Sequence, residues 1–61
     1  MQFTIEKARQ YGGFTQTEIA KKLNISTKTY QSYEYGKVSM RMDKALKFSE
    51  LTKIPLKQII F

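Results

Sequence analysis

The segment Gln16-Thr-Glu-Ile-Ala-Lys-Lys-Leu-Asn-Ile-Ser-Thr-Lys-Thr-Tyr-Gln-Ser-Tyr-Glu-Tyr35 has an apolar pattern that one continuous helix does not produce. Its first three apolar residues have the i, i+1, i+4 spacing of one helix face, and they are Ile19, Ala20 and Leu23. The register then breaks across 24–26, and Tyr30 and Tyr33 begin a new stripe. This pattern predicts a helix-turn-helix, whose second helix commonly faces a DNA groove.

Residues that favour helix ends flank both halves of the pattern. Thr15 is a good N-cap, and Glu18 completes a capping box with it. Asn24 suits the joint because Asn tolerates left-handed backbone geometry. Ser26 or Thr27 can cap the next helix. The local signals therefore agree with the two helices that the apolar pattern predicts.

Three further short helices are expected outside this segment, at about 5–11, from 41 or 42 to 52, and at 55–60. Thr4 can cap the first and Gly12-Gly13 can end it, while Pro55 fits the first turn of the last. Gly36 stops the third helix near Tyr35. No segment alternates apolar and polar residues for long enough to predict a strand. The expected fold is all-α, with five short helices in a single domain, 1–61.

Helical spacing also predicts which residues face the core. In the helix-turn-helix, a small residue is needed at Ala20, where the helices approach most closely, and the other inward positions are Ile19, Leu23, Ile25, Tyr30 and Tyr33. The expected inner face of the first helix is Ile5, Ala8 and Tyr11. The expected stripe of the fourth helix is Met42, Ala45, Leu46 and Ser49, widened by Phe48 and Leu51.

Composition narrows the function classes. The 61 residues contain 11 Lys and Arg against 5 Asp and Glu, a net charge of +6, which favours nucleic acid or an anionic membrane surface as partner. The alternative is a basic excess that only keeps a small protein soluble. Without Cys or His, we expect no disulfide, no metal site and no cofactor. The same absence, with no paired carboxylates and no Gly-rich phosphate loop, argues against an enzyme and a small-molecule substrate.

Membrane association is not expected. No apolar run approaches the ~20 residues that a span requires, and the N-terminus does not resemble a signal peptide. Basic residues occur along every expected helix instead of on one amphipathic face, which disfavours peripheral membrane binding. We therefore expect a cytoplasmic protein.

The motifs also carry a family resemblance, which rests on Thr15–Ala20, Asn24–Ser26 and Tyr33–Lys37. From about Ile5 to Ile60 the chain resembles the Cro/phage-repressor type (XRE-like) of helix-turn-helix proteins. The resemblance implies a compact lambda-repressor-like domain that binds double-stranded DNA, a Cro-like repressor of a phage or mobile element. The chain departs from it at Met40-Arg41, where many members have Pro-Ser or a similar cap, so Ser39 is the expected substitute.

The predicted base-reading residues are Gln16, Thr27, Lys28, Gln31 and Ser32. The resemblance implies that Gln16 opens the second helix, contacts the DNA backbone and supports readout. The other four residues follow from helix geometry. If Tyr30 and Tyr33 point inward, the residues at offsets 0, 1, 4 and 5 from Thr27 lie together on the outer face of the helix. Lys28 can donate to guanine, and Gln31 can pair with adenine. The alternative is a solvated polar face without a partner.

The predicted phosphate contacts are Arg9, Thr15, Lys37 and Arg41. The resemblance also pairs Arg9 with Glu34, which orients the Arg and places Glu34 in the scaffold. A solvated charge is the alternative for Arg41.

Two further expectations concern partners. The apolar C-terminal segment 54–61 is a candidate homodimer interface, because related proteins dimerise there, and a twofold dimer predicts a palindromic operator. The competing function is an antitoxin or inhibitor-type protein-binding module on the same fold.

Overall fold

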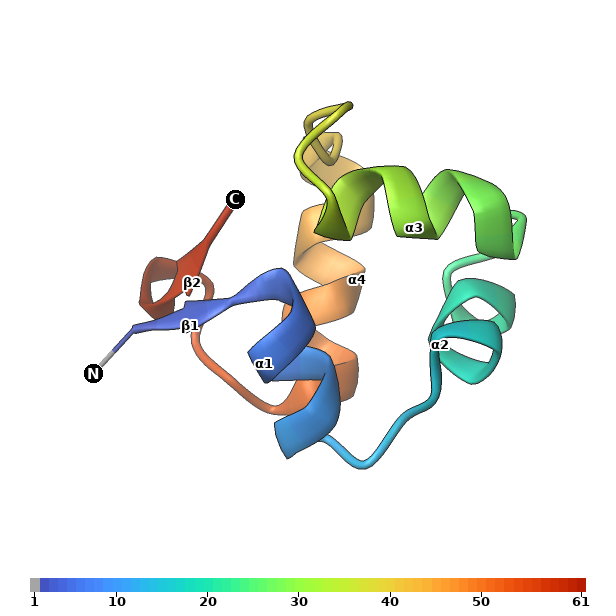
Figure 1. The fold of residues 1–61 in the computed structure, drawn as a ribbon. Coiled ribbons are helices and arrows are strands. Elements are labelled where there is room, and N and C mark those ends of the chain that lie inside the picture. Colours follow the sequence, from blue (N-terminus) through green and yellow to red (C-terminus); the bar gives the residue numbers. More distant parts are fainter. Residues whose placement is uncertain (1) are drawn as a thin grey trace.

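Four α-helices lie within residues 2–61, the part of the chain that the computed structural model describes (Figure 1). They are α1 (Ile5–Tyr11), α2 (Gln16–Lys22), α3 (Thr27–Glu34) and α4 (Met42–Thr52). The other elements are the 3-10 turn η1 (Leu56–Gln58) and the strands β1 (Phe3–Thr4) and β2 (Ile59–Ile60). The predicted compact helical fold is confirmed, with extents of 28 × 21 × 18 Å, but the five-helix count is wrong.

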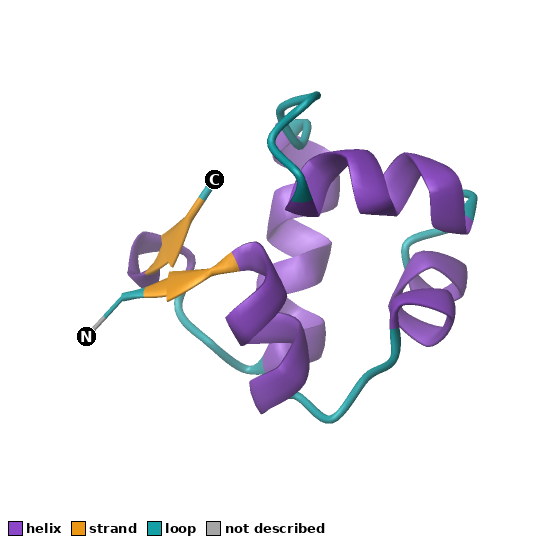
Figure 2. Ribbon diagram, in the orientation of Figure 1, coloured by secondary structure: helices purple, strands orange, loops and turns teal. Residues whose placement is uncertain are grey.

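The helix predicted for 55–60 is absent, because this segment forms only one 3-10 turn followed by β2. Pro55 has an extended ψ of 139°, so it precedes the turn and does not begin a helix. β2 pairs in parallel with β1, with Phe3 opposite Ile59, and Figure 2 shows the strands side by side. Two-residue strands are too short to show a periodic pattern, and their pairing joins opposite ends of the sequence.

The predicted N-caps of α1 to α3 are present. Thr15 and Glu18 form both hydrogen bonds of the capping box. The Thr4 side chain accepts a hydrogen bond from the Lys7 backbone, and Ser26 accepts one from Thr29. α4 differs, because its N-cap is Arg41, which makes no side-chain capping bond, so the expected cap at Ser39 is wrong.

Left-handed backbone positions separate the helices. Gly13 and Gly36 have φ values of 82° and 77°, after α1 and α3 respectively. Asn24 has φ 62° in the joint between α2 and α3, as its residue type predicts. The chain therefore turns sharply after Leu23, and Ile25 is held by a 3.0 Å hydrogen bond from its amide to the Ala20 carbonyl.

The core sits where α1, α3 and α4 meet, with α2 packed against α3. The predicted inward residues Ile19, Ala20, Leu23, Tyr30 and Tyr33 are all buried, and Ile25 packs beside them. The prediction for Tyr11 is wrong: it is exposed, with its ring 5.4 Å from the ring of Phe3. Met42 and Leu46 are also exposed, against expectation.

The inner face of α4 is Ala45, Phe48 and Thr52, so the prediction is confirmed for Ala45 and Phe48 but did not include Thr52. Thr52 is polar and did not enter the apolar pattern, which shifted the predicted face around the helix. Its burial is satisfied locally, because its hydroxyl donates to the Phe48 carbonyl at 2.9 Å. Met42 and Leu46 therefore lie beside the buried stripe and not within it.

Ala20→Leu tests the contact between α2 and α3. Ala20 is buried at this contact, so added methylenes force neighbouring side chains or the backbone to move, and we expect a loss of about 1–3 kcal/mol in the free energy of unfolding. Urea unfolding measures it. Lys22→Leu, at an exposed position of α2, is the control with an expected change within about 0.5 kcal/mol. An unchanged midpoint for Ala20→Leu contradicts the close approach.

Candidate nucleic-acid interface

The inward face of α3 determines which side chains it presents outward. Tyr30 and Tyr33 are buried with their rings edge to face, 6.5 Å apart. On the other side of the helix Lys28 is exposed, and Thr27, Gln31 and Ser32 are half-buried. The structure thus places the four predicted α3 residues away from the two core tyrosines. The Ser32 hydroxyl donates to the Lys28 carbonyl at 3.2 Å, within the helix.

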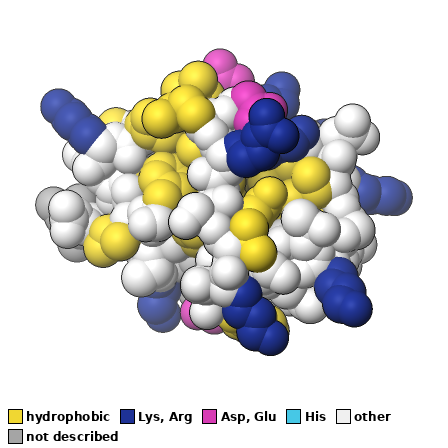
Figure 3. Space-filling view, turned by 90° about the horizontal axis from the view of Figure 1, so that it is seen from above, with side chains coloured by type: hydrophobic (Ala, Val, Ile, Leu, Met, Phe, Trp, Pro, Cys, Tyr) yellow, Lys and Arg dark blue, Asp and Glu magenta, His cyan; other side chains and the backbone are white. Residues whose placement is uncertain are grey.

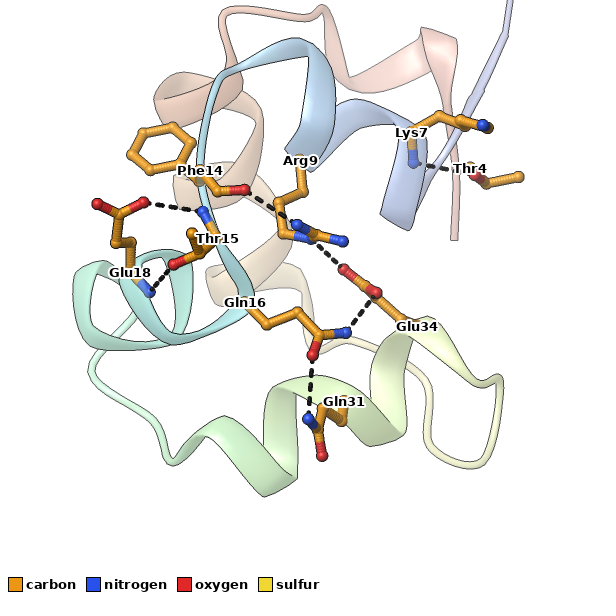
Figure 4. Close-up of polar contacts among 9 residues, drawn as sticks. All are labelled: Thr4, Lys7, Arg9, Phe14, Thr15, Gln16, Glu18, Gln31 and Glu34. Carbon is orange, nitrogen blue, oxygen red and sulfur yellow. Dashed lines mark hydrogen bonds and ion pairs between the residues drawn. The ribbon is translucent and has the colours of Figure 1, made fainter.

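A chain of polar contacts crosses from α1 to α2 and α3 (Figure 4). Arg9 Nε donates to Glu34 Oε2 at 2.6 Å, and Arg9 Nη1 donates to the Phe14 carbonyl at 3.0 Å. Gln16 Nε2 donates to the other carboxylate oxygen, Glu34 Oε1, at 2.9 Å. Gln31 Nε2 then donates to Gln16 Oε1 at 3.0 Å. The expected Arg9–Glu34 pair is therefore present and continues through two amides to α3.

The pair is charged at neutral pH. Burial by itself raises the pKa of Glu34, but hydrogen bonds from Arg9 and Gln16, the Tyr30 hydroxyl and the Arg9 charge lower it overall. Burial by itself lowers the pKa of Arg9, and the hydrogen bond and charge of Glu34 raise it overall. Both side chains therefore keep their charges, and each compensates the other's burial.

The Tyr30 hydroxyl lies beside this pair. It is buried and has no partner at hydrogen-bond geometry among residues 2–61, although it is close enough to Glu34 for their titrations to interact. Burial and the nearby carboxylate both raise the pKa of Tyr30, so its hydroxyl remains protonated. The carboxylate of Glu34 is thus surrounded by groups that favour its ionised form.

Stability is expected to fall in acid through Glu34. Its folded pKa is below the ordinary value of 4.5, so its contribution is complete above that value and is lost as the pH falls through the folded pKa. Urea unfolding at a series of pH values measures the effect. Glu34→Gln removes this acid-dependent part, whereas Glu50→Gln, at an exposed position of α4, keeps it. Parallel curves for the wild type and Glu34→Gln contradict the assignment.

The predicted phosphate contacts differ in their surroundings. Thr15 is exposed at the start of α2, with its hydroxyl accepting from the Glu18 amide at 3.1 Å, and Arg9 is mostly covered. Lys37 is exposed just after α3. Arg41 is exposed too, with its Nε 3.7 Å from Asp43 Oδ1. The structure therefore gathers Arg9 and Gln16 beside α3 and leaves Arg41 at the start of α4.

Basic side chains are distributed widely over the surface. On the face drawn in Figure 3, most Lys and Arg side chains lie near the outline, and one group lies further in beside Asp and Glu side chains.

Within the described chain no pocket is found, and no cluster of His, Cys, Asp or Glu could hold a metal ion. None of the helices in residues 2–61 is long and apolar enough to cross a membrane. The helix-turn-helix surface is the strongest candidate site.

Sequence reasoning did not predict that Gln16 bridges Glu34 and Gln31. The pair Arg9–Glu34 and the outward position of Gln31 were each expected, but the contact between them was not. A signal was present in the sequence, because Gln16 opens α2 and Gln31 lies four residues after Thr27 on the edge of α3. Using that signal needs the packing of α2 against α3, which residue spacing alone does not provide.

Comparison with known proteins agrees with this geometry. The model of a family described as Helix-turn-helix matches residues 5–59, which is most of the chain. Neither the curated proteins nor the solved structures give a significant match.

Proposed function

The chain belongs to the Cro/XRE-like helix-turn-helix family of DNA-binding transcription regulators, and we propose that it is a Cro-like repressor that reads an operator in the major groove. The observation that carries this proposal is the division of α3 into two faces. Tyr30 and Tyr33 fix the helix to the core, and its other face is polar and accessible. Such a helix, supported by a second helix packed against it, suits the major groove.

We assign base readout to Gln16, Thr27, Lys28, Gln31 and Ser32. Lys28 is the exposed member on α3, and its ammonium can donate to guanine O6 or N7. Arg9, Thr15, Lys37 and Arg41 are the proposed phosphate contacts. Lys37 is well suited because it is exposed just after α3, whereas Arg41 lies near the carboxylate of Asp43, at 3.7 Å.

Selection of bound sequences from a random pool of double-stranded DNA tests the proposed function. An enriched consensus supports specific readout, and the absence of enrichment contradicts it. In that second outcome the protein-binding module becomes the better proposal, because exposed apolar residues such as Val38, Met42 and Leu46 are available to a partner.

Lys28→Ala is expected to weaken binding to the selected operator by about 1–3 kcal/mol and to relax preference at one base pair. The reason is the loss of a donor to a base edge. Titrations against the operator and against single-base variants measure both effects. Lys47→Ala, which removes one exposed charge from α4, is the matched control. An equal loss on every sequence shows that Lys28 contacts phosphate and not a base.

We also propose a homodimer that uses the C-terminal region. Ile60 of β2 and the next residue, Phe61, are about half exposed, and the Phe61 ring lies 6.3 Å from that of the buried Phe48. A twofold dimer places two α3 helices one DNA turn, ~34 Å, apart and requires a palindromic operator. Sedimentation equilibrium with and without DNA, read with the symmetry of the consensus, tests this arrangement.

A further inference from the structure

Hydrogen bonds link Glu34 to Gln16 and Gln16 to Gln31. The chemistry of the carboxylate and the two amides determines which group donates in each bond. An ionised carboxylate only accepts hydrogen bonds, and Arg9 already donates to one oxygen of Glu34. Gln16 must therefore turn its NH2 group toward the other oxygen, as its 2.9 Å contact shows. This leaves the Gln16 carbonyl oxygen facing α3.

The same constraint passes on to Gln31. Because Gln16 presents an oxygen, Gln31 must donate to it, which it does through Nε2 at 3.0 Å. The Gln31 oxygen is then free, and Figure 4 shows it directed away from Gln16. Each amide has two possible orientations in isolation, but only one of them satisfies every group in this chain of contacts.

We propose that Glu34 is a specificity-determining residue that does not touch DNA: through Gln16, it makes Gln31 present its oxygen to the base pairs. This inference rests on the proposed readout function of α3. In the major groove, an outward oxygen accepts from adenine N6 or cytosine N4. Glu34 and Gln16 are therefore positioning residues for Gln31, and the lowered pKa of Glu34 keeps the arrangement in place at neutral pH.

Glu34→Gln has a consequence that a purely structural role does not produce. Arg9 still requires an oxygen, so the amide at position 34 turns its NH2 toward Gln16. Gln16 must then turn its oxygen to position 34 and its NH2 to Gln31. Gln31 turns in response and presents its own NH2 outward, which favours the acceptors guanine O6 and N7, adenine N7 and thymine O4. The substitution nearly keeps the shape of the side chain and reverses the polarity at the reading surface.

The test compares operator preferences from random-pool selection for the wild type and four variants. Gln31→Ala identifies the base pair that Gln31 reads. At that pair, Glu34→Gln is expected to change the preference between donor and acceptor edges by about tenfold or more, the scale of a good polar base contact. Gln16→Glu combined with Glu34→Gln restores the wild-type preference, because the carboxylate at position 16 accepts from both neighbours.

Gln16→Met is the variant that keeps the Arg9–Glu34 pair, so it remains informative if Glu34→Gln fails to fold. It removes the bridge and is expected to abolish the preference at the Gln31 base pair, while the preferences assigned to Thr27, Lys28 and Ser32 persist. The proposal is overturned if Glu34→Gln folds and keeps the wild-type preference there, if Gln16→Met keeps it, or if Gln31→Ala changes no preference.

A DNA-independent measurement separates this inference from the proposed function. Neutron diffraction from crystals of the deuterated wild-type chain distinguishes the nitrogen and oxygen of each amide. We expect the Gln31 nitrogen, not its oxygen, to face Gln16, and the opposite orientation overturns the proposal. If the orientation is as expected but the wild type enriches no DNA sequence, the proposed readout function fails while the polarity of the contacts stands.

Discussion

Glu34→Ala is expected to lower the free energy of unfolding by about 3–5 kcal/mol, because it leaves the covered guanidinium of Arg9 without its counter-charge. The side chains of Arg9 and Glu34 are only 13% and 3% exposed. The substitution also removes the acceptor of Gln16. A domain of this size typically has about 3–5 kcal/mol of net stability, so the variant should be largely unfolded at room temperature. Circular dichroism and urea unfolding measure the loss.

Two matched variants show whether the loss comes from burial of the charge. Asp43→Ala breaks an exposed ion pair, in which the side chain of Arg41 is 82% exposed and that of Asp43 is 64% exposed. This change should cost at most about 1 kcal/mol. Replacing Arg9 and Glu34 together by Met removes both charges and should be less harmful than Glu34→Ala. Similar losses in Glu34→Ala and Asp43→Ala contradict the special cost of the buried pair.

Phe48→Ala is expected to have a comparable effect, about 3–5 kcal/mol, because it leaves a cavity at the centre of the core. Phe48 is fully buried on α4, with its ring 6.3 Å from those of Tyr30 and Phe61. Its loss removes support from α3 as well as from the C-terminal end. Thermal unfolding and urea titration measure the change in stability.

Leu46→Ala is the control for Phe48→Ala, because it shortens an apolar side chain on the exposed side of the same helix. We expect a change within about 0.5 kcal/mol. A large loss for Leu46→Ala, or a small one for Phe48→Ala, contradicts the inner face that the structure gives to α4.

The sequence predicted the helix-turn-helix well because its signals are local. Capping at Thr15 and Ser26, and the left-handed turn at Asn24, depend on residues within one helical turn. α4 was placed correctly along the chain, but its inner face was shifted because the buried Thr52 is polar. The β1–β2 pair was missed, since two-residue strands have no pattern of their own and form only when the two ends of the chain meet.

The candidate site was predicted to a similar extent. The pairing of Arg9 with Glu34 and the outward position of Lys28 agree with the structure. The bridge formed by Gln16 was not predicted, because the direction of an amide depends on groups from three helices at once. Spacing predicts which residues share a face, whereas the orientation of a polar side chain requires the contacts of the folded domain.

The β1–β2 pair also determines on which side of the domain the first and last described elements lie. Figure 1 places this pair on the side of the domain opposite α2. Since the strands are parallel, the first residue of β1 and the last residue of β2 lie at opposite ends of the pair along the strand direction. A fluorophore or a surface tether attached before β1 therefore leaves the domain on the side opposite α2, whereas a group attached after β2 lies at the proposed dimer surface.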